Sequence, residues 1–452
     1  MSALNPPPEV LEIAARLRRA GFEAWCVGGA VRDALVGHAH LDWDLATSAK
    51  PEEVKAVFKR VIPVGVEFGT VGVFGSGGDV MHEVTTFRKD VTADGRHAVV
   101  QFGVSLDDDL ARRDFTINAI AYNPDTGELR DPFDGRTDLR RGIVRAVGVA
   151  EERFTEDRLR ALRGIRFASR FGFNIEPTTW AAIKASAPHL GRLSAERVKQ
   201  ELEKTMQQVE RPSVALEWWR ECGALAALVP SIAAAPVERF RALDVLMLGT
   251  GAVLGALAAE ARRAEAESGT LDRLSMLFFG DEPSTVEQAT KALKFSNYDA
   301  SWIVAMARAR RDVGAAIDAV FESRDAEPAQ IRRWVATVGR TRTDAFCRLN
   351  GALHLARVST LDPKSGGIVP DAAVVARLDA FRALAVEIAF RDPIEMADLA
   401  VDGEDLRSAG VPAGPAMGRV LKLLLERVIE NPAENTVATL TAAAKALAGA
   451  NA

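Results

Sequence analysis

The sequence contains few cysteines and few tyrosines. Its 452 residues include three cysteines and two tyrosines, and Cys26, Cys222 and Cys347 lie far apart. Scattered cysteines in odd number supply neither the paired ligands of a zinc site nor a disulfide framework. We therefore expect a reduced cytosolic chain without zinc or disulfide bonds.

Targeting and membrane signals are also missing from the sequence. The chain begins MSALNPPPEV, which lacks the charged-then-apolar pattern of a signal peptide. Its longest apolar stretch, residues 245–259, is shorter than the roughly 20 residues needed to span a bilayer. We interpret this stretch as a buried helix that is interrupted near Gly249-Thr250-Gly251. We expect a cytoplasmic protein that binds no membrane and no protein partner.

An excess of positive charge is the third missing feature. The formal net charge is −5, whereas simple nucleic-acid-binding proteins are basic. Any contact with RNA must therefore come from a local basic face. The chain is 48% hydrophobic and 26% charged, as soluble globular proteins are. Its length exceeds that of one ordinary core, which predicts two or more domains.

A glycine pair and an aspartate pair form the first candidate site. Gly28-Gly29 precedes Asp42-Trp43-Asp44 on a predicted strand, where residues i and i+2 project from one face. Close carboxylates need a cation, and oxygen ligands suit Mg²⁺ held together with substrate phosphates. Glycine backbone can approach those phosphates closely, and the Arg32 guanidinium matches phosphate oxygens. Each pair alone also occurs in ordinary turns or at solvated strand ends.

Two further charged motifs follow along the chain. Residues 112–119 read RRDFTINA, and residues 156–167 read EDRLRALRGIRF. In a helix over the second motif, positions 156, 160, 163 and 167 lie on one stripe and bring an acid and arginines to one face. Taken by themselves, the motifs also fit a surface ion-pair cluster and an exposed, charge-laced helix.

With these motifs, residues 22–205 resemble the nucleotidyltransferase superfamily that includes DNA polymerase beta. More narrowly, they resemble the class II CCA-adding enzymes and the bacterial poly(A) polymerases. The pattern GGxVRD before DxD, the run HEVTTFR at residues 82–88, RRDFTINA and EDxxRxxRxxRF carry this resemblance. The resemblance implies an α+β N-terminal head of the polymerase-beta-like type, followed by an all-α neck, body and tail. We predict a catalytic head over 1–147, a neck over 148–210 and a tRNA-binding body and tail over 211–452.

The resemblance implies a role for each motif residue. Asp42 and Asp44 would bind Mg²⁺, and Glu83 would be a third catalytic carboxylate beside them. The predicted nucleotide-binding residues are Gly28, Gly29, Arg32, Arg113, Asp114, Asn118, Glu156, Asp157, Arg160, Arg163 and Arg166. Within this set, Arg113 would contact phosphate or sugar, while Asp114 and Asn118 would order the pocket.

In this interpretation, residues of the neck select the base. In the family, an Asp and an Arg at the positions of Asp157 and Arg160 pair with the Watson–Crick edge of the incoming base. A carboxylate accepts from an exocyclic amine, and a guanidinium donates to a ring nitrogen or carbonyl. C and A both present an amine beside an acceptor, so one pair can select both. Arg163 and Arg166 would hold the triphosphate.

The local pattern also predicts individual elements. We expect helices over residues 9–20, 30–36 and 51–60, strands over 22–27, 41–46, 70–74 and 80–87, and a helix from 156 to 173. Ser194 is expected to cap a helix that braces the nucleotide-binding helix. Residues 89–103 contain few apolar side chains and are expected to form a mobile loop, at the position where CCA-adding relatives switch from C to A.

Three activities and one inactive role fit this sequence. CCA addition to the 3′ end of tRNA from CTP and ATP, by two-metal nucleotidyl transfer that uses Mg²⁺ and releases pyrophosphate, is the first, because Gly65 and the run Phe68-Gly69-Thr70-Val71 resemble the CCA-adding branch. Poly(A) polymerases of this class carry a basic stretch there instead. The alternatives are a poly(A) polymerase, a split enzyme adding only CC or only A, and a silent RNA-binding protein. The last would be expected to lose a metal ligand, yet Asp42 and Asp44 are both present.

Overall fold

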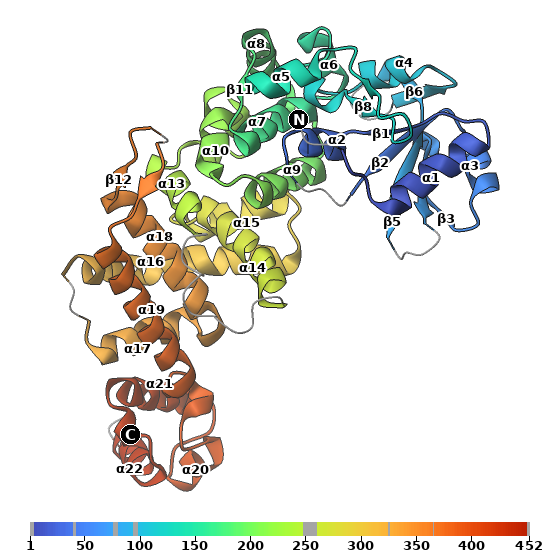
Figure 1. Ribbon diagram of the computed structural model, residues 1–452. Helices are drawn as coiled ribbons and strands as arrows, with labels where there is room; N and C mark the ends of the chain where they lie inside the picture. Colours follow the sequence, from blue (N-terminus) through green and yellow to red (C-terminus); the bar gives the residue numbers. More distant parts are fainter. Residues whose placement is uncertain are drawn as a thin grey trace. The chain divides into compact units, whose positions relative to one another are not determined.

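The computed structural model describes residues 4–38, 42–75, 80–93, 98–246, 260–323, 326–364 and 366–449. The chain forms two compact units. The first comprises Met1–Glu210 and Val214–Pro230, and the second comprises Arg211–Ser213 and Ser231–Ala452. We describe each unit by itself (Figure 1).

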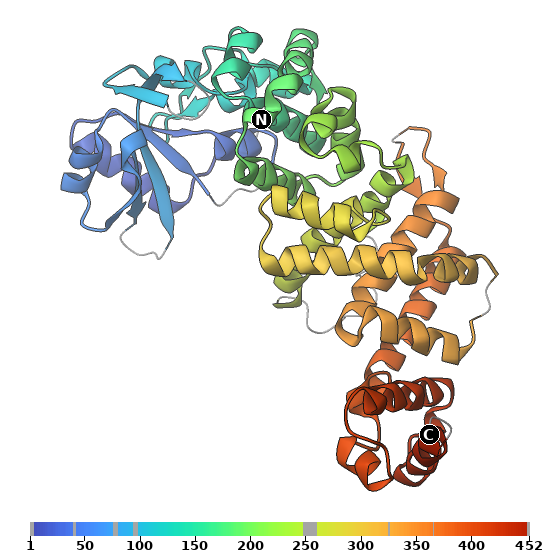
Figure 2. The ribbon, with the colours of Figure 1, turned by 180° about the vertical axis from the view of Figure 1, so that it is seen from behind.

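A seven-stranded mixed sheet is the centre of the first unit (Figure 2). Its strand order is β3-β4-β5-β2-β1-β8-β9, in which β2 and β5 are parallel and the other neighbours are antiparallel. The strands are β1 (Ala24–Val27), β2 (Asp44–Thr47), β3 (Val61–Gly65), β4 (Thr70–Phe74), β5 (Met81–Thr86), β8 (Ala121–Tyr122) and β9 (Leu129–Arg130). The expected α+β head is confirmed.

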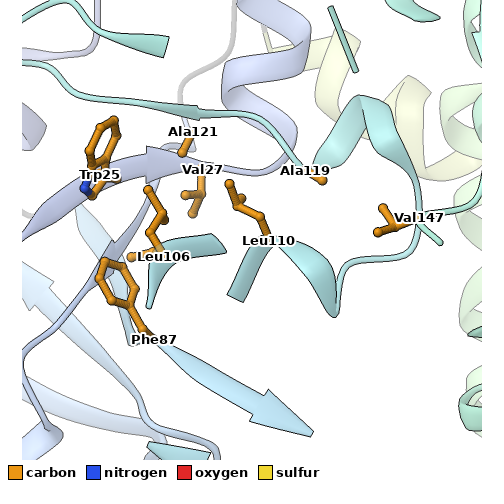
Figure 3. Close-up of a cluster of buried hydrophobic side chains, with 9 residues drawn as sticks. Trp25, Val27, Phe87, Leu106, Leu110, Ala119, Ala121 and Val147 are labelled. Atoms are coloured by element: carbon orange, nitrogen blue, oxygen red, sulfur yellow. The ribbon is translucent and has the colours of Figure 1, made fainter. Parts of the chain in front are cut away.

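Apolar side chains on one side of this sheet form a buried cluster with helix α4 (Leu106–Ala111). Figure 3 shows Trp25 and Val27 of β1 facing Leu106 and Leu110 of α4, with Phe87 beside them. These five side chains are at most 8% exposed. Burial of such side chains is the main force that holds α4 on the sheet.

The helices predicted over residues 9–20, 30–36 and 51–60 are present as the first three helices of this unit. The first, α1, buries Val10, Ile13, Ala14 and Leu17, spaced three and four residues apart as one face of a helix requires. Helix α1 spans Pro8–Arg19, and the other helices are α2 (Gly29–Leu35), α3 (Pro51–Val57), α5 (Gly135–Arg141), α6 (Ala150–Glu156), α7 (Leu159–Phe171), α8 (Pro177–Ser186), α9 (Ala195–Gln208), α10 (Pro212–Glu221) and α11 (Ala224–Leu228). Helix α12 (Pro230–Ala233) begins at the last residue of the first unit and continues into the second. Ser194 accepts a hydrogen bond from the Arg197 N–H and caps α9, as predicted.

The single helix predicted from residue 156 to 173 is wrong. Helix α6 ends at Glu156 and α7 begins at Leu159. Asp157 between them is extended (φ −147°, ψ 104°), and its Oδ1 accepts the Leu159 N–H at 3.1 Å. Such a local side chain–backbone bond competes with helical hydrogen bonding. Glu156 and Arg160 therefore belong to different helices, although their side chains still form an ion pair at 3.0 Å.

Three other local predictions need correction. Residues 88–102 form a hairpin of β6 (Arg88–Ala93) and β7 (Ala98–Phe102) rather than a loop, with residues 94–97 outside the described part. Helix α3 ends at Val57, and the edge strand β3 follows it unpredicted. Strand β2 begins at Asp44, so Asp42 precedes the strand on which it was predicted to lie.

In the residues that the structure describes, the second unit is helical apart from one short pair of strands, β12 (Thr360–Leu361) and β13 (Ile368–Val369). A cluster that includes Leu406, Leu424 and Leu440 holds its last three helices together. Its helices are α13 (Val237–Val245), α14 (Glu260–Leu277), α15 (Pro283–Ala292), α16 (Asn297–Ser323), α17 (Pro328–Val338), α18 (Thr343–Val358), α19 (Ala372–Arg391), α20 (Gly403–Ser408), α21 (Pro415–Glu430) and α22 (Val437–Gly449).

Two expectations concern apolar and sulfur-containing residues. The broken helix predicted over 245–259 lies largely outside the described residues, which stop at 246 and resume at 260. Over the described ranges, no helix is both long and apolar enough to cross a membrane. Cys26, Cys222 and Cys347 are buried free thiols.

Candidate active site

A polar pocket of about 500 Å³ in the first unit collects the motif residues. Asp44 lines it, together with every predicted nucleotide-binding residue except Glu156. Asp42 and Glu83 are not among the lining residues. The lining atoms come from the sheet, from α2 and from the neck helices α7 and α9, so the pocket depends on the tertiary fold.

The glycine turn forms one wall. Gly28 has φ +77°, a conformation that favours glycine, and Gly29 begins α2. A Cβ atom at Gly28 would lie 3.2 Å from Arg113 Nη1 and 3.8 Å from Asp44 Oδ2. The backbone here is therefore open to a ligand at a point where a side chain would crowd the arginine and the aspartate.

Asp44 lies where three strands meet. It pairs with Val27 of β1, and the next residue, Leu45, pairs with Val84 of β5. Glu83 is therefore the β5 residue that precedes this pair. Burial, followed by the charges of Asp42 and Glu83, raises the pKa of Asp44 to about 7, against a lowering by Arg113. The three carboxylates thus act on one another electrostatically, although Asp42 itself is exposed and Trp43 is buried.

The carboxylates near the glycine turn fit a Mg²⁺ ion that is held together with the phosphates of a nucleotide. In the part of the chain that the structure describes, no three His, Cys, Asp or Glu side chains form a ligand set for a metal ion. Mg²⁺ is commonly held by one or two carboxylates plus substrate phosphates and water. Asp44 lies beside the glycine turn and the charge of Asp42 acts on it, so these two carboxylates would supply such a pair.

Arg32 is buried and is held by several protein partners. It is 3% exposed, its Nη2 lies 2.6 Å from Asp33 Oδ1, and its Nη1 donates to Asn118 Oδ1 at 2.5 Å. Its guanidinium also lies over the Phe167 and Phe171 rings, at 4.8 and 4.9 Å from their centroids. Arg32 is therefore held rigidly where it reaches the pocket.

Asp114 organises the middle of the pocket. Its Oδ1 accepts from Asn118 Nδ2 at 2.8 Å, and its Oδ2 accepts from Arg163 Nε at 2.8 Å. Burial alone would raise the pKa of Asp114, but the Arg163 charge and these hydrogen bonds lower it to about 2. The carboxylate is therefore ionised and keeps both neighbours in place, as the ordering role requires.

Asp157 and Arg160 face the pocket at the start of α7. Asp157 Oδ2 accepts from Arg197 Nη2 at 2.7 Å. Arg160 Nη1 donates to Glu156 Oε2 at 3.0 Å, and its Nη2 donates to the Arg112 carbonyl at 2.9 Å. Glu156 therefore acts on the pocket by holding Arg160, and both predicted base-reading groups are fixed by neighbours.

Helix α9 packs against α7, as the resemblance led us to expect, and it also supplies pocket-lining residues that we did not predict. Arg197, Lys204 and Gln208 line the pocket, and Glu201 between them binds Arg166 (Nε to Oε1, 2.6 Å). Positions 197, 201, 204 and 208 follow helical spacing and form one polar face. That spacing was readable in the sequence, but nothing in it showed that this face lines the pocket. Arg112 and Arg170 also line the pocket without having been predicted as nucleotide-binding residues.

Two family models match this chain. Residues 24–145 match "Poly A polymerase head domain", and residues 172–235 match "Probable RNA and SrmB- binding site of polymerase A". The first match covers the mixed sheet with Asp44, and the second begins directly after α7.

Relatives of known name extend the comparison. The CCA-adding enzyme of Streptococcus pyogenes is 46% identical over 211 residues, which are 46% of this chain and 52% of that protein. That of Latilactobacillus sakei is 42% identical over 265 residues, 56% of this chain and 66% of that protein. The chain thus spans about half the length of the first of these relatives. A crystal structure of the Bacillus stearothermophilus CCA-adding enzyme in complex with CTP is 31% identical, with a TM-score of 0.71 and 98% of both chains covered.

The fold and the pocket define a protein with a nucleotidyltransferase head of the poly(A) polymerase type, followed by helices. The likeness to the Bacillus stearothermophilus structure extends this match through both units. The chain belongs to the family of CCA-adding enzymes.

Proposed function

We propose that this protein adds C, C and A to the 3′ end of tRNA, using CTP and ATP and releasing pyrophosphate. One observation carries the proposal: a single pocket joins a glycine turn and Asp44 to the Asp157–Arg160 pair. The turn and the carboxylate serve phosphate chemistry that is common to all nucleotides. The pair on α7 serves base choice without a nucleic-acid template.

Phosphate chemistry takes place at the end near Asp44. The terminal 3′-oxygen of the RNA attacks the α-phosphorus, the bond to pyrophosphate breaks and the hydroxyl proton is lost. Asp42 and Asp44 would hold Mg²⁺, which when bound neutralises the phosphate charge and favours the deprotonated hydroxyl. The backbone of Gly28-Gly29 contacts phosphate oxygens, and Arg113, which lies 3.2 Å from the position of a Gly28 Cβ, adds positive charge.

Base choice takes place at the end near α7. The Asp157 carboxylate accepts from the amine of C or A, and the Arg160 guanidinium donates to the neighbouring ring nitrogen. U and G do not present that arrangement, so they leave hydrogen-bonding groups of Asp157 and Arg160 without a partner on the base. A mismatch of this kind costs about 1–3 kcal/mol per lost pairing.

The nature of the product tests the proposal. Purified protein is incubated with tRNA that ends at the discriminator base, with Mg²⁺, CTP and ATP, and the product ends are sequenced. CCA ends are expected. CC ends alone or a single A would assign a split enzyme, and no incorporation would leave an RNA-binding role.

Poly(A) addition is the second candidate, because the matching head model carries that description. It predicts long A tails without C on the same tRNA. Asp157→Ala tests the base-reading role itself. If this carboxylate reads the base, the variant should incorporate the four nucleotides with less discrimination than the wild type. Lys184→Ala, an exposed residue of α8 that pairs with Glu221, is the matched control and should choose bases as the wild type does.

A further inference from the structure

Two ion pairs on one face of α7 tie this helix to the head. Arg163 Nη2 lies 2.8 Å from Asp114 Oδ2, and Arg170 Nη2 lies 3.0 Å from Asp33 Oδ2. Seven residues make about two helical turns, so both arginines point to the same side. The side chains of Asp114 and Asp33 are 9% and 1% exposed, whereas those of Arg163 and Arg170 are 31% and 27% exposed, so the carboxylate of each pair is shielded from water and the guanidinium is partly solvated.

The head connects the two ion pairs to each other. Arg32 binds Asp33 and donates to Asn118, and Asn118 donates to Asp114. The result is a closed ring of side chains that begins and ends on α7. We name it the head–neck ring; its members are Arg163, Asp114, Asn118, Arg32, Asp33 and Arg170.

The head–neck ring lies between the two halves of the nucleotide site. On one side, Arg32 and Asp33 belong to α2, which begins at the phosphate-binding glycine turn. On the other side, Arg163 and Arg170 belong to α7, which begins next to Asp157 and contains Arg160. A nucleoside triphosphate that touches both halves requires one particular spacing between the two helices.

We propose that Arg170 is a positioning residue, which sets this spacing through its ion pair with Asp33. The proposal rests on the function proposed above, because it takes the pocket as a nucleotide site. Asp33 keeps Arg32 as a partner when Arg170 is replaced, so the variant loses the tether without leaving a buried charge unpaired. The Arg170 guanidinium also packs 4.8 Å from the Phe171 ring centroid, which holds it in place in the wild type.

The test compares ligands that fill one half of the site or both. CTP spans both halves, inorganic triphosphate fills the glycine-turn half, and cytidine fills the base-reading half. For Arg170→Met, we expect the KM for CTP and for ATP to rise about tenfold. A ligand that contacts both halves of the site binds well only when the two halves are correctly spaced. The inhibition constants of triphosphate and of cytidine should stay within about twofold of the wild type.

Two variants make the comparison sharper. Arg170→Lys keeps the charge and should recover most of the CTP affinity. Lys199→Met removes a cation that pairs with Glu203 along α9, at 3.5 Å. It should leave the KM for CTP and the inhibition constants of triphosphate and cytidine unchanged. If Arg170→Met does not fold, Arg170→Gln, which keeps a hydrogen-bond donor on a shorter and uncharged side chain, is compared with the same three ligands.

Two outcomes would overturn the proposal. An equal loss of affinity for triphosphate and for CTP would show that Arg170, which lines the pocket, binds phosphate directly. An unchanged KM for CTP in both Arg170→Met and Arg170→Gln would show that the spacing does not depend on this residue. The proposed function fails separately, if the wild-type protein adds neither C nor A.

Discussion

The Asp157 carboxylate and the Arg197 guanidinium form an ion pair, with 2.7 Å between Oδ2 and Nη2. Asp157 Oδ1 is held as well, by the Leu159 N–H. Each carboxylate oxygen has two acceptor positions, so both remain able to accept a hydrogen bond from a base amine. The ion pair therefore restricts the rotation of the group that is proposed to read the base.

Arg197→Met is expected to weaken base discrimination. Both side chains are partly exposed, 38% for Arg197 and 28% for Asp157, so we expect a modest effect of about three- to tenfold. The measurement is the ratio of kcat/KM for CTP to that for UTP. Lys204→Met is the control, because it removes a cation from the pocket lining away from this ion pair. An equal loss of discrimination in the control would attribute the effect to the general charge of the pocket.

Asp44→Asn is expected to abolish nucleotidyl transfer while tRNA binding persists. A lost metal ligand removes several kcal/mol of transition-state stabilisation, on the order of a 10³-fold loss of rate or more. Single-turnover incorporation and a filter-binding assay with tRNA measure the two properties separately. EDTA should stop the wild-type reaction, and Mg²⁺ should restore it. Incorporation by Asp44→Asn at a wild-type rate would contradict the metal assignment.

Gly164→Ala is expected to lower the stability of the first unit. The added Cβ would lie 2.8 Å from Phe115 Cζ, and Phe115 is fully buried. Overpacking costs about 1–3 kcal/mol, which exceeds the roughly 1 kcal/mol that alanine contributes over glycine in a helix. Thermal unfolding should therefore begin at a lower temperature. Gly191→Ala, where nothing lies within 4 Å of the added atom, is the control, and equal transitions in both variants would argue against close packing at Gly164.

Glu176→Gln is expected to change the acid stability of the neck. Burial acts to raise the pKa of Glu176, but hydrogen bonds from Thr178 and Thr179 lower it from 4.5 to about 2. A carboxyl with a lowered pKa in the folded state stabilises the fold above its unfolded pKa and loses that contribution as pH falls. The wild type should thus exceed the variant in urea stability at pH 7, by a margin that shrinks from about pH 4.5 towards pH 2. A margin that does not change with pH would exclude this carboxylate as its source.

Local sequence pattern was enough to predict much of the head. The apolar spacing of α1, the Ser194 cap and the β4–β5 strand pair all depend on residues close together in the chain. The same pattern failed where a local polar contact competed with helical spacing. At Asp157, one side-chain hydrogen bond to the Leu159 N–H ends α6 and begins a new helix. The helical spacing of residues carries no information about a side chain–backbone contact of that kind.

The candidate site also has features that the sequence predicts and features that depend on packing. The motifs alone showed which chemical groups are available: a glycine turn, neighbouring aspartates and a run of arginines around Gly164. The use of these groups depends on contacts between elements that are distant in the chain. The tertiary structure holds Arg32 between Asp33 and Asn118, places Arg197 on Asp157, and joins α2 to α7 through Arg170. These partners lie up to 137 residues apart in the chain, and their pairing follows from the packing of sheet and helices, which no short motif encodes.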